Sequence, residues 1–491
     1  MSNVVWFSNM PLFRNIFKKR FIYTKVYVNS SRPIQQLAVV NDEQCLYPPI
    51  IDTSKEGLQR HARQMWYDSI KALPTVEEKM YELALQQRSH LKVFQLNSIC
   101  NTYVGVPFQS YITRTHVING LPEHITGINV DQELDEIRNV FCEVLYKDII
   151  RSWKANEQMN LSELFSKKDS GIRLLQALIA QSYKKLGRKN DYILESVIQQ
   201  KTRINSFWWH SGFESEKKKL FEENLCFQYS DVAAFSIRMK QPLLPIVDMS
   251  DPLCATADVP DYNFIPNTLG FHSEREKIIS VPGYWAGDPC EYPLLLVFPR
   301  SYLQVLLKKI EKYDLSKIEE GFAVMASFGW LNAIATYQGF TPFHDLTYPL
   351  VTQTILTNGR DWNFFVYQLN TIAFHSDVDK KDRRNICWSS GRMRLFDTIE
   401  DGKLKGLNDE VFKLILRFLL NAPLEREGVV LKPHLGEDLR TEEELRIFRF
   451  FFKRMYSRCP DPMAYKNEVP TWRRIYKMHP DAPPTPYIRN D

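Results

Sequence analysis

A run of 24 residues without Asp, Glu, Lys or Arg, Gly321–His344, limits what this chain can fold into more than any other feature. The run is long enough to cross a lipid bilayer as a helix. It also contains three glycines and the polar side chains of Ser327, Asn332 and Gln338, which lower its hydropathy. A helix buried in the core of a soluble protein therefore fits better than a membrane span, and we expect no membrane-spanning segment.

Two strand-like runs follow the uncharged run, Val351–Thr357 and Trp362–Leu369. They are separated by Asn358-Gly359, which is the strongest short-range signal for a β-hairpin. A type I′ turn needs positive φ at both central residues, and Asn and Gly adopt that conformation most readily. We therefore predict a hairpin whose tight turn is formed by Asn358 and Gly359.

Periodicity elsewhere predicts both helices and strands. Apolar residues at helical spacing predict helices, whereas β-branched and aromatic residues between turn signals predict strands. The predicted segments are a helical hairpin at 54–89, strands within 95–120, helices at 131–153 and 170–187, short strands with proline-containing turns at 203–300, and a helix capped by Asn408 and ended by Pro423. These patterns predict the α+β fold class: a mixed helical and β body with a central hairpin, plus a basic C-terminal helix and coil tail.

The net charge of +5 over the whole chain suggests little affinity for nucleic acid, but the charge is distributed unevenly along the sequence. Residues 1–41 carry six basic side chains and no acid, which amounts to +6. Residues 42–444 carry −7, residues 445–480 carry +7, and the last eleven residues carry −1. The sequence therefore consists of an acidic body between two basic ends.

The basic N-terminal end has the features of a mitochondrial presequence. Segment 12–22 places apolar side chains such as Ile16 on one helical face, and Arg14 and Lys18 on another. An acid-free, basic, amphipathic start is typical of mitochondrial import signals, and the apolar core of a secretory signal does not follow it. We interpret residues 1–40 as a presequence. A basic arm that binds RNA or lipid is the alternative.

The basic C-terminal end combines cations with aromatic rings. Thr441–Glu444 predicts a capping box, in which the Thr hydroxyl and the Glu carboxylate satisfy end-of-helix amides, and Pro460 ends the helix. RNA binding uses cations for phosphates and planar groups for base stacking. A solvated charged helix with a flexible end is the alternative. The predicted RNA-binding residues are Arg446, Arg449, Lys453, Arg454, Arg458, Trp472, Arg473, Arg474, Tyr476 and Lys477.

The sequence lacks the local motifs of metal sites and common enzymes. None of the eight cysteines forms a CxxC pair, so a zinc ribbon is excluded and we expect reduced, buried thiols, with Cys142 in the core. A phosphate loop, a dinucleotide-binding glycine motif, a nucleophile elbow and HExxH are also missing. We therefore predict no catalytic residue, no metal site and no cofactor.

Two histidines nevertheless allow for an active site built from dispersed residues. His210 lies among tryptophan and phenylalanine neighbours, which favours a packed, hydrogen-bonded imidazole over a general base. His375 begins a cluster with Asp377 and Asp379, but the adjacent lysines and arginines would repel a metal ion. A solvated loop is therefore the favoured interpretation of that cluster. A matrix enzyme with a site around either histidine is the leading alternative function.

Residues 321–423 contain a series of short runs that resemble one known family. The runs occur in the same order and at similar spacing as in that family: Tyr337–Phe340, Tyr367–Thr371, Asn385–Trp388, Thr398–Asp401 and Gly406–Asp409. The region is similar to the mitochondrial ribosomal protein family first numbered thirty in the small-subunit series. That family is also called programmed cell death protein nine and is now assigned to the large subunit. Weaker similarity extends over most of the body.

The resemblance implies a structural protein of the mitochondrial large ribosomal subunit, bound to the ribosome in the matrix and supporting mitochondrial translation. Its expected partners are the large-subunit rRNA and neighbouring mitochondrial ribosomal proteins, including a related large-subunit paralogue. RNA contact by the tail rests on the tail's own chemistry, because the tail extends beyond the family pattern. We divide the chain into a presequence (1–40), a globular body (41–430) and a basic C-terminal extension (431–491). A non-ribosomal RNA-binding adaptor is the second alternative.

Overall fold

The computed structural model describes the body of the chain and a short part of its C-terminal extension. The described residues are 52–74, 78–79, 91–98, 105–150, 171–214, 222–262, 264–276, 280–284, 288–300, 315–342, 344–376, 383–400, 403–433, 441–444 and 446–447. The chain divides into two compact units, Met1–Leu58 and Gln59–Asp491. Helix α2 (Lys55–Lys71) begins in the first unit and continues into the second, and the Ser54 hydroxyl before it accepts a hydrogen bond from the Gly57 amide at 3.0 Å. The predicted presequence lies outside the described residues.

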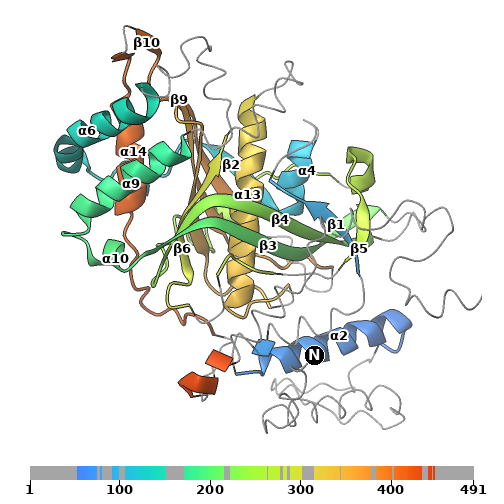
Figure 1. Cartoon of the computed structure of the whole chain (residues 1–491). Helices are drawn as coiled ribbons and strands as arrows, with labels where there is room; N and C mark the ends of the chain where they lie inside the picture. The colour runs from blue at the N-terminus through green and yellow to red at the C-terminus, as the bar shows by residue number, and fades with distance from the viewer. Residues whose placement is uncertain are drawn as a thin grey trace, which may run out of the picture. The chain divides into compact units, whose positions relative to one another are not determined.

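Within the described part of the second unit, nine strands form one mixed sheet (Figure 1). Their order is β2-β9-β8-β7-β6-β4-β1-β5, with β3 paired to β4. The strands are β1 (Leu91–Leu96), β2 (Thr115–Asn119), β3 (Val197–Glu214), β4 (Glu222–Met239), β5 (Ser273–Glu276), β6 (Tyr292–Pro299), β7 (Leu350–Thr357), β8 (Asp361–Leu369) and β9 (Asn385–Arg394). A separate small hairpin joins β10 (Thr398–Glu400) to β11 (Lys403–Lys405).

Helices cover both faces of this sheet. Helices α4 and α13 contribute to the apolar core on one face, and α6, α9 and α14 contribute to the core on the other. The bounds are α4 (Gly105–Ile112), α5 (Glu123–Thr126), α6 (Asp131–Leu145), α9 (Ile172–Leu186), α10 (Asp191–Leu194), α11 (Pro252–Thr256), α13 (Leu315–Tyr337) and α14 (Asp409–Leu420). A π-helical turn (Tyr146–Ile150) follows α6, and a 3₁₀ turn (Pro266–Leu269) precedes β5. The predicted α+β character is confirmed.

Strand β6, helix α13 and strand β7 form a crossover unit at the centre of the sheet. β6 and β7 are parallel neighbours, so a helix between them is the expected connection. All eight residues of β6 are buried. Leu296 and Phe298 face the core around α13, whereas Leu295 and Val297 face the opposite core. A strand that is covered on both faces does not alternate between apolar and polar residues, because neither face contacts solvent. This explains the continuous apolar sequence of β6.

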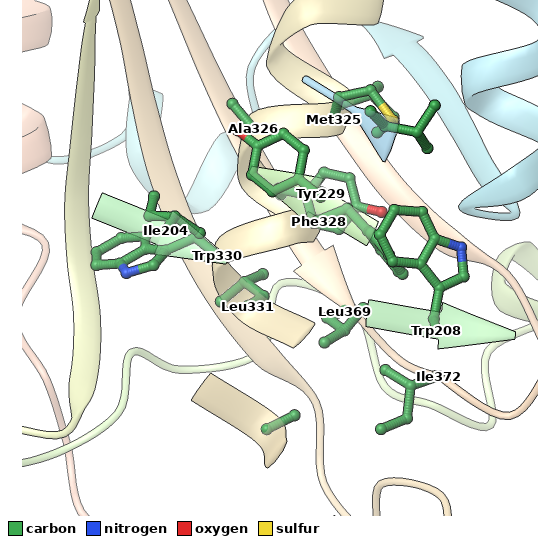
Figure 2. Packing of buried hydrophobic residues seen from close by; sticks show 14 of the residues in the cluster. Ile204, Trp208, Tyr229, Met325, Ala326, Phe328, Trp330, Leu331, Leu369 and Ile372 are labelled. Atoms are coloured by element: carbon green, nitrogen blue, oxygen red, sulfur yellow. The ribbon is translucent and has the colours of Figure 1, made fainter. Parts of the chain in front are cut away.

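The uncharged run forms most of α13 and is a core helix, as predicted. Every residue from 321 to 342 is buried. Figure 2 shows side chains of α13 packed among residues of β3, β4 and β8. The rings of Phe328 and Trp208, for example, meet edge to face with centroids 4.9 Å apart. Among the residues that the structure describes, no helix is both long and apolar enough to cross a membrane.

The polar side chains of this helix find partners inside the protein. The Asn332 amide donates to the carbonyl oxygen of Phe207 at 2.9 Å, and the Ser327 hydroxyl lies 2.8 Å from that of Thr354. The Trp330 indole donates to a backbone carbonyl at 3.0 Å. These bonds offset the cost of burying polar groups, which would otherwise be about 1–3 kcal/mol each.

The predicted hairpin between β7 and β8 is confirmed, but its turn is of another type. Asn358 pairs with Asp361, so the two central residues are Gly359 and Arg360. Of these two, only Gly359 has positive φ, at 95°. That combination fits a type II′ turn, not the predicted type I′ turn. The Asn358 side chain accepts hydrogen bonds from the amides of Arg360 and Asp361, at 3.0 and 2.8 Å, and so closes the turn from outside the central pair.

Several other predicted elements are confirmed. The predicted helix at 131–153 is α6 with its π-helical turn, and the one at 170–187 is α9. Asn408 caps α14 by accepting from the Glu410 amide at 3.0 Å. Of the predicted helical hairpin at 54–89, the structure describes α2 and a helical Glu78–Lys79. The rest of that segment lies outside the described residues.

Two strand predictions are wrong in part. Region 95–120 contains α4 between β1 and β2, because burial of Phe108 and Ile112 in the core around α13 overrides their β propensity. Region 203–300 contains β4 and most of β3, two paired 18-residue strands, instead of short strands alone. Tyr229 of β4 belongs to the core around α13, whereas Phe235 belongs to the opposite core. The change of face obscures the period-two pattern by which strands are recognised.

Gly329 allows α13 to lie close to β4, and this contact yields a testable prediction. A Cβ at Gly329 would lie 2.4 Å from the ring of buried Tyr229. Overpacking costs about 1–3 kcal/mol, which exceeds the roughly 1 kcal/mol gained from the better helix propensity of alanine. We expect Gly329→Ala to lower the free energy of unfolding in urea by about 1 kcal/mol. Combining it with Tyr229→Leu should remove most of that penalty; purely additive effects in this double-mutant cycle would contradict the contact.

Candidate functional site

The predicted RNA-binding tail is described only at its beginning. The capping box is present: the Thr441 amide donates to the Glu444 carboxylate at 2.9 Å, and the Glu444 amide donates to the Thr441 hydroxyl at 3.4 Å. Arg446 follows on the helix and is exposed to solvent. The remaining predicted residues lie outside the described part of the chain: Arg449, Lys453, Arg454, Arg458, Trp472, Arg473, Arg474, Tyr476 and Lys477. Their RNA contact stays a prediction.

His210 is a packed, hydrogen-bonded side chain, as predicted. Only 3% of it is exposed, and its Nδ1 donates to the carbonyl oxygen of Ser211 at 2.6 Å. Its ring lies 4.6 Å from that of Tyr111 and 5.5 Å from that of Phe374, measured between centroids. The imidazole therefore contributes to the core where β3 meets the segment after β8.

His375 is buried, contrary to the predicted solvated loop. It is 3% exposed, and its ring lies edge to face with Trp209 at 6.0 Å. The structure brings the two histidine segments together, because the Ser211 amide donates to the Phe374 carbonyl oxygen at 2.9 Å. The two segments are more than 150 residues apart in sequence, so no local pattern could predict this contact. The acidic part of the cluster, Asp377 and Asp379, lies outside the described residues.

Asp345 also has a structural contact set. Its carboxylate accepts from the Thr371 hydroxyl at 2.7 Å and from the Ile372 amide at 2.9 Å, and it lies 3.5 Å from the Arg383 guanidinium. These bonds hold together the loops that precede and follow the β7–β8 hairpin. Among the described residues, no group of three or more His, Cys, Asp or Glu side chains could hold a metal ion.

A buried charge network around Glu319 is the polar feature that sequence reasoning missed. Glu319 has no exposed surface and lies near the start of α13. The Arg300 Nε donates to its carboxylate at 2.6 Å, and the Asn363 amide donates at 2.9 Å. Arg392 lies 3.3 Å from the same carboxylate, and Arg300 lies 3.0 Å from Asp361. The network connects the end of β6, α13, β8 and β9, which are far apart in sequence.

The network can position elements, and its charged groups are all paired. Each charge faces an opposite charge or an amide, and Arg300 and Glu319 are both fully buried. No local spacing connects these residues, so no sequence motif could have identified them. The Glu319 carboxylate is the one charge in the buried part of α13, and Arg300 neutralises it.

The described thiols are free, and most are buried. Cys226, Cys254, Cys290 and Cys387 are buried, which confirms the expectation for them. Cys142 is only partly buried, so its predicted core position is wrong: it lies beside the apolar stripe of α6 and not on it. Burial raises the pKa of the Cys226 and Cys387 thiols, and burial together with Asp251 raises that of Cys254 to about 11.

Comparison with known proteins decides the family. Residues 17–423 match the family described as mitochondrial 28S ribosomal protein S30 (PDCD9). The chain belongs to this family. The match covers most of the chain and ends before the basic C-terminal extension.

Similar full-length proteins are named as large-subunit proteins. Large ribosomal subunit protein mL37 of Mus musculus is 24% identical over 315 residues, which are 60% of this chain and 64% of that protein. The protein of the same name from Rattus norvegicus is 23% identical over 336 residues, 66% of this chain and 70% of that protein. The chain thus spans about two thirds of the length of these relatives. The family description names a mitochondrial ribosomal protein, and these relatives are named as proteins of the large ribosomal subunit.

The buried network of this PDCD9-family protein predicts an unequal cost of removing charges. Glu319→Gln should lower the free energy of unfolding by about 3 kcal/mol, because the buried guanidinium of Arg300 then loses one of its two carboxylate partners. Glu143→Gln is the matched control, because it breaks the exposed ion pair with Lys147 and should cost less than about 0.5 kcal/mol. Urea denaturation followed by circular dichroism measures both. Equal costs would contradict the role assigned to the network.

Burial of the thiols predicts their reactivity. Iodoacetamide at mildly alkaline pH should leave Cys226 and Cys387 unmodified in the native protein, because burial blocks access and the raised pKa keeps the thiols protonated. Both should react after unfolding in urea. Peptide mass spectrometry gives the extent at each cysteine, with half-buried Cys142 as the internal comparison. Rapid native modification of Cys387 would show that the described packing opens easily.

Proposed function

We propose that this chain is a structural constituent of the mitochondrial large ribosomal subunit, where it supports mitochondrial translation through protein–protein and rRNA contacts. The observation that carries the proposal is the family match over residues 17–423. The names of the mL37 relatives point to the large subunit in particular. Since the chain spans about two thirds of those relatives, their assembly partners are transferred to it here as a proposal.

The contacts of the described residues support a scaffold over a dispersed active site. The titratable groups that the sequence offers as catalytic candidates, His210 and His375, pack against aromatic rings inside the body. Asp345 and Glu319 accept hydrogen bonds from groups that join distant segments. A body whose buried polar groups are used to hold elements together suits a protein that maintains the relative positions of its neighbours.

We further propose three functional parts: a presequence at 1–40, a globular body at 41–430 and a basic extension at 431–491. The acidic body meets protein neighbours, including a related large-subunit paralogue, and the extension docks on the large-subunit rRNA. The charge of −7 for residues 42–444 beside +7 for residues 445–480 supports this division. Phosphate contacts supply a large, salt-dependent share of RNA affinity, whereas protein interfaces depend more on shape and apolar cores.

Co-sedimentation tests the proposed function. A tagged full-length chain imported into mitochondria should migrate with the large subunit in sucrose gradients at high salt, because an integral component is held by many contacts at once. A non-ribosomal adaptor should dissociate at that salt, since its binding depends on phosphate contacts. A matrix enzyme should remain near the top of the gradient at any salt. Either of those two results would overturn the proposal.

The tail generates a separate prediction about assembly. Deleting residues 441–491 should reduce incorporation into the large subunit, measured as the tagged fraction that co-sediments. A triple variant should reproduce part of the loss of incorporation: Arg473→Gln, Arg474→Gln and Lys477→Gln. Adding Trp472→Leu and Tyr476→Leu should lower incorporation further, because stacking of a base on an aromatic ring is worth about 1–3 kcal/mol. Unchanged incorporation of the deletion variant would show that the tail is not an rRNA handle.

A further inference from the structure

A dense group of cations occurs at the end of α9, inside the part of the chain that is acidic overall. Lys184 and Lys185 lie in the last turn of the helix, and Arg188 and Lys189 lie in the turn that follows. All four side chains are exposed. We call these four residues the α9 basic cluster. With Asp191 included, residues 184–191 carry +3, whereas residues 42–444 together carry −7.

The backbone beneath the α9 basic cluster is held in one conformation. The amides of Lys189 and Asn190 both donate to the Leu186 carbonyl oxygen at 3.0 Å, and the Asn190 side chain donates to the same oxygen at 3.1 Å. Gly187 packs closely against Leu194 of α10. A Cβ atom at position 187 would lie only 2.6 Å from a Leu194 methyl group. The last turn of α9 and the turn that joins it to α10 (Figure 1) are therefore held in place, and binding to the cluster needs little ordering of the backbone.

Most of the α9 basic cluster is not neutralised by the protein itself. Lys189 lies 3.5 Å from Glu136, and both side chains are half-exposed. Among the described residues, no carboxylate forms an ion pair with Lys184, Lys185 or Arg188. Some other exposed lysines on the same body are paired.

The paired lysines illustrate the contrast. Lys147 pairs with Glu143, and Lys405 pairs with Glu400. The α9 basic cluster therefore places four exposed cations within six consecutive residues, and three of them have no carboxylate partner among the described residues.

Helix stability explains only part of this arrangement. Cations in the last turn interact favourably with the helix dipole, which accounts for Lys184 and Lys185. Arg188 and Lys189 lie beyond the end of the helix, where that effect falls off. They stand four residues after Lys184 and Lys185, so that each cation has like charge nearby. Close like charges repel one another, and an anionic ligand would relieve the repulsion.

We infer that the α9 basic cluster is a second RNA-binding surface, which contacts the phosphate backbone of rRNA independently of the C-terminal extension. The inference rests on the proposed ribosomal function. Phosphate contacts require clustered cations on a fixed scaffold and carry no base specificity. The cluster contains no aromatic side chain for stacking, and charged residues are depleted from the cores of protein–protein interfaces. A phosphate backbone therefore fits this surface better than an acidic protein neighbour.

Charge neutralisation in the full chain tests the inference. The test variant replaces three cations of the cluster: Lys184→Gln, Lys185→Gln and Arg188→Gln. The control variant replaces three exposed cations elsewhere on the body and has the same net charge: Lys92→Gln, Lys147→Gln and Lys405→Gln. Circular dichroism confirms that both variants are folded. The binding probe is a transcript of the mitochondrial large-subunit rRNA, titrated by filter binding over a series of salt concentrations.

The expected result is a specific change in the salt dependence. The slope of log K against log salt is negative, and losing three phosphate contacts should make it less steep by about 2. Binding at low salt should weaken roughly tenfold or more. The control triple should match the unaltered chain closely. Equal behaviour of the two triple variants would overturn the inference. If the unaltered chain still co-sediments with the large subunit in that case, the proposed function survives without this surface.

Lysine labelling in purified subunits distinguishes RNA from protein as the occupant. Lys184, Lys185 and Lys189 should be acetylated by a water-soluble reagent in the free chain and protected in the large subunit, as measured by mass spectrometry. Brief ribonuclease treatment should restore labelling if RNA covers the cluster. Protection that survives ribonuclease would assign the surface to a protein neighbour and overturn the inference, as would full labelling in the intact subunit.

Discussion

Burial of the uncharged part of helix α13 against one face of the sheet is the constraint on which the rest of the structure depends. A helix that is apolar all round needs cover on every side, and here the cover comes from strands of the sheet and from α4. Burying one large apolar side chain contributes about 1.5–3 kcal/mol. The gain requires that Ser327, Trp330 and Asn332 find partners, and each does so on a different segment of the body.

The same constraint explains why the buried polar groups are structural. Glu319 enters the core at the start of α13 and is neutralised by Arg300 from the end of β6. This pair fixes the beginning of the crossover helix relative to the strand that precedes it. The histidines that the sequence offers as catalytic candidates are likewise surrounded by rings and backbone carbonyls.

Sequence reasoning succeeded where the physical cause is local. The β7–β8 hairpin, the Asn408 cap and the capping box at Thr441 each depend on residues within a few positions of one another. It failed where distant contacts decide. The face change along β4 depends on which layer covers each half of the strand, and α4 is helical because of what it packs against. Even within the hairpin, pairing of Asn358 with Asp361 moved the turn by one residue.

The sequence by itself determined that a long uncharged segment must be buried, that charge is separated into an acidic body and basic ends, and that the chain resembles a mitochondrial ribosomal protein family. Only the tertiary structure decided which charges are used internally and which remain available. Glu319 has partners up to 73 residues away, whereas Lys184, Lys185 and Arg188 have no carboxylate partner among the described residues. Ion pairing depends on distance in space, and the hydrophobic burial that sets those distances is a property of the whole fold.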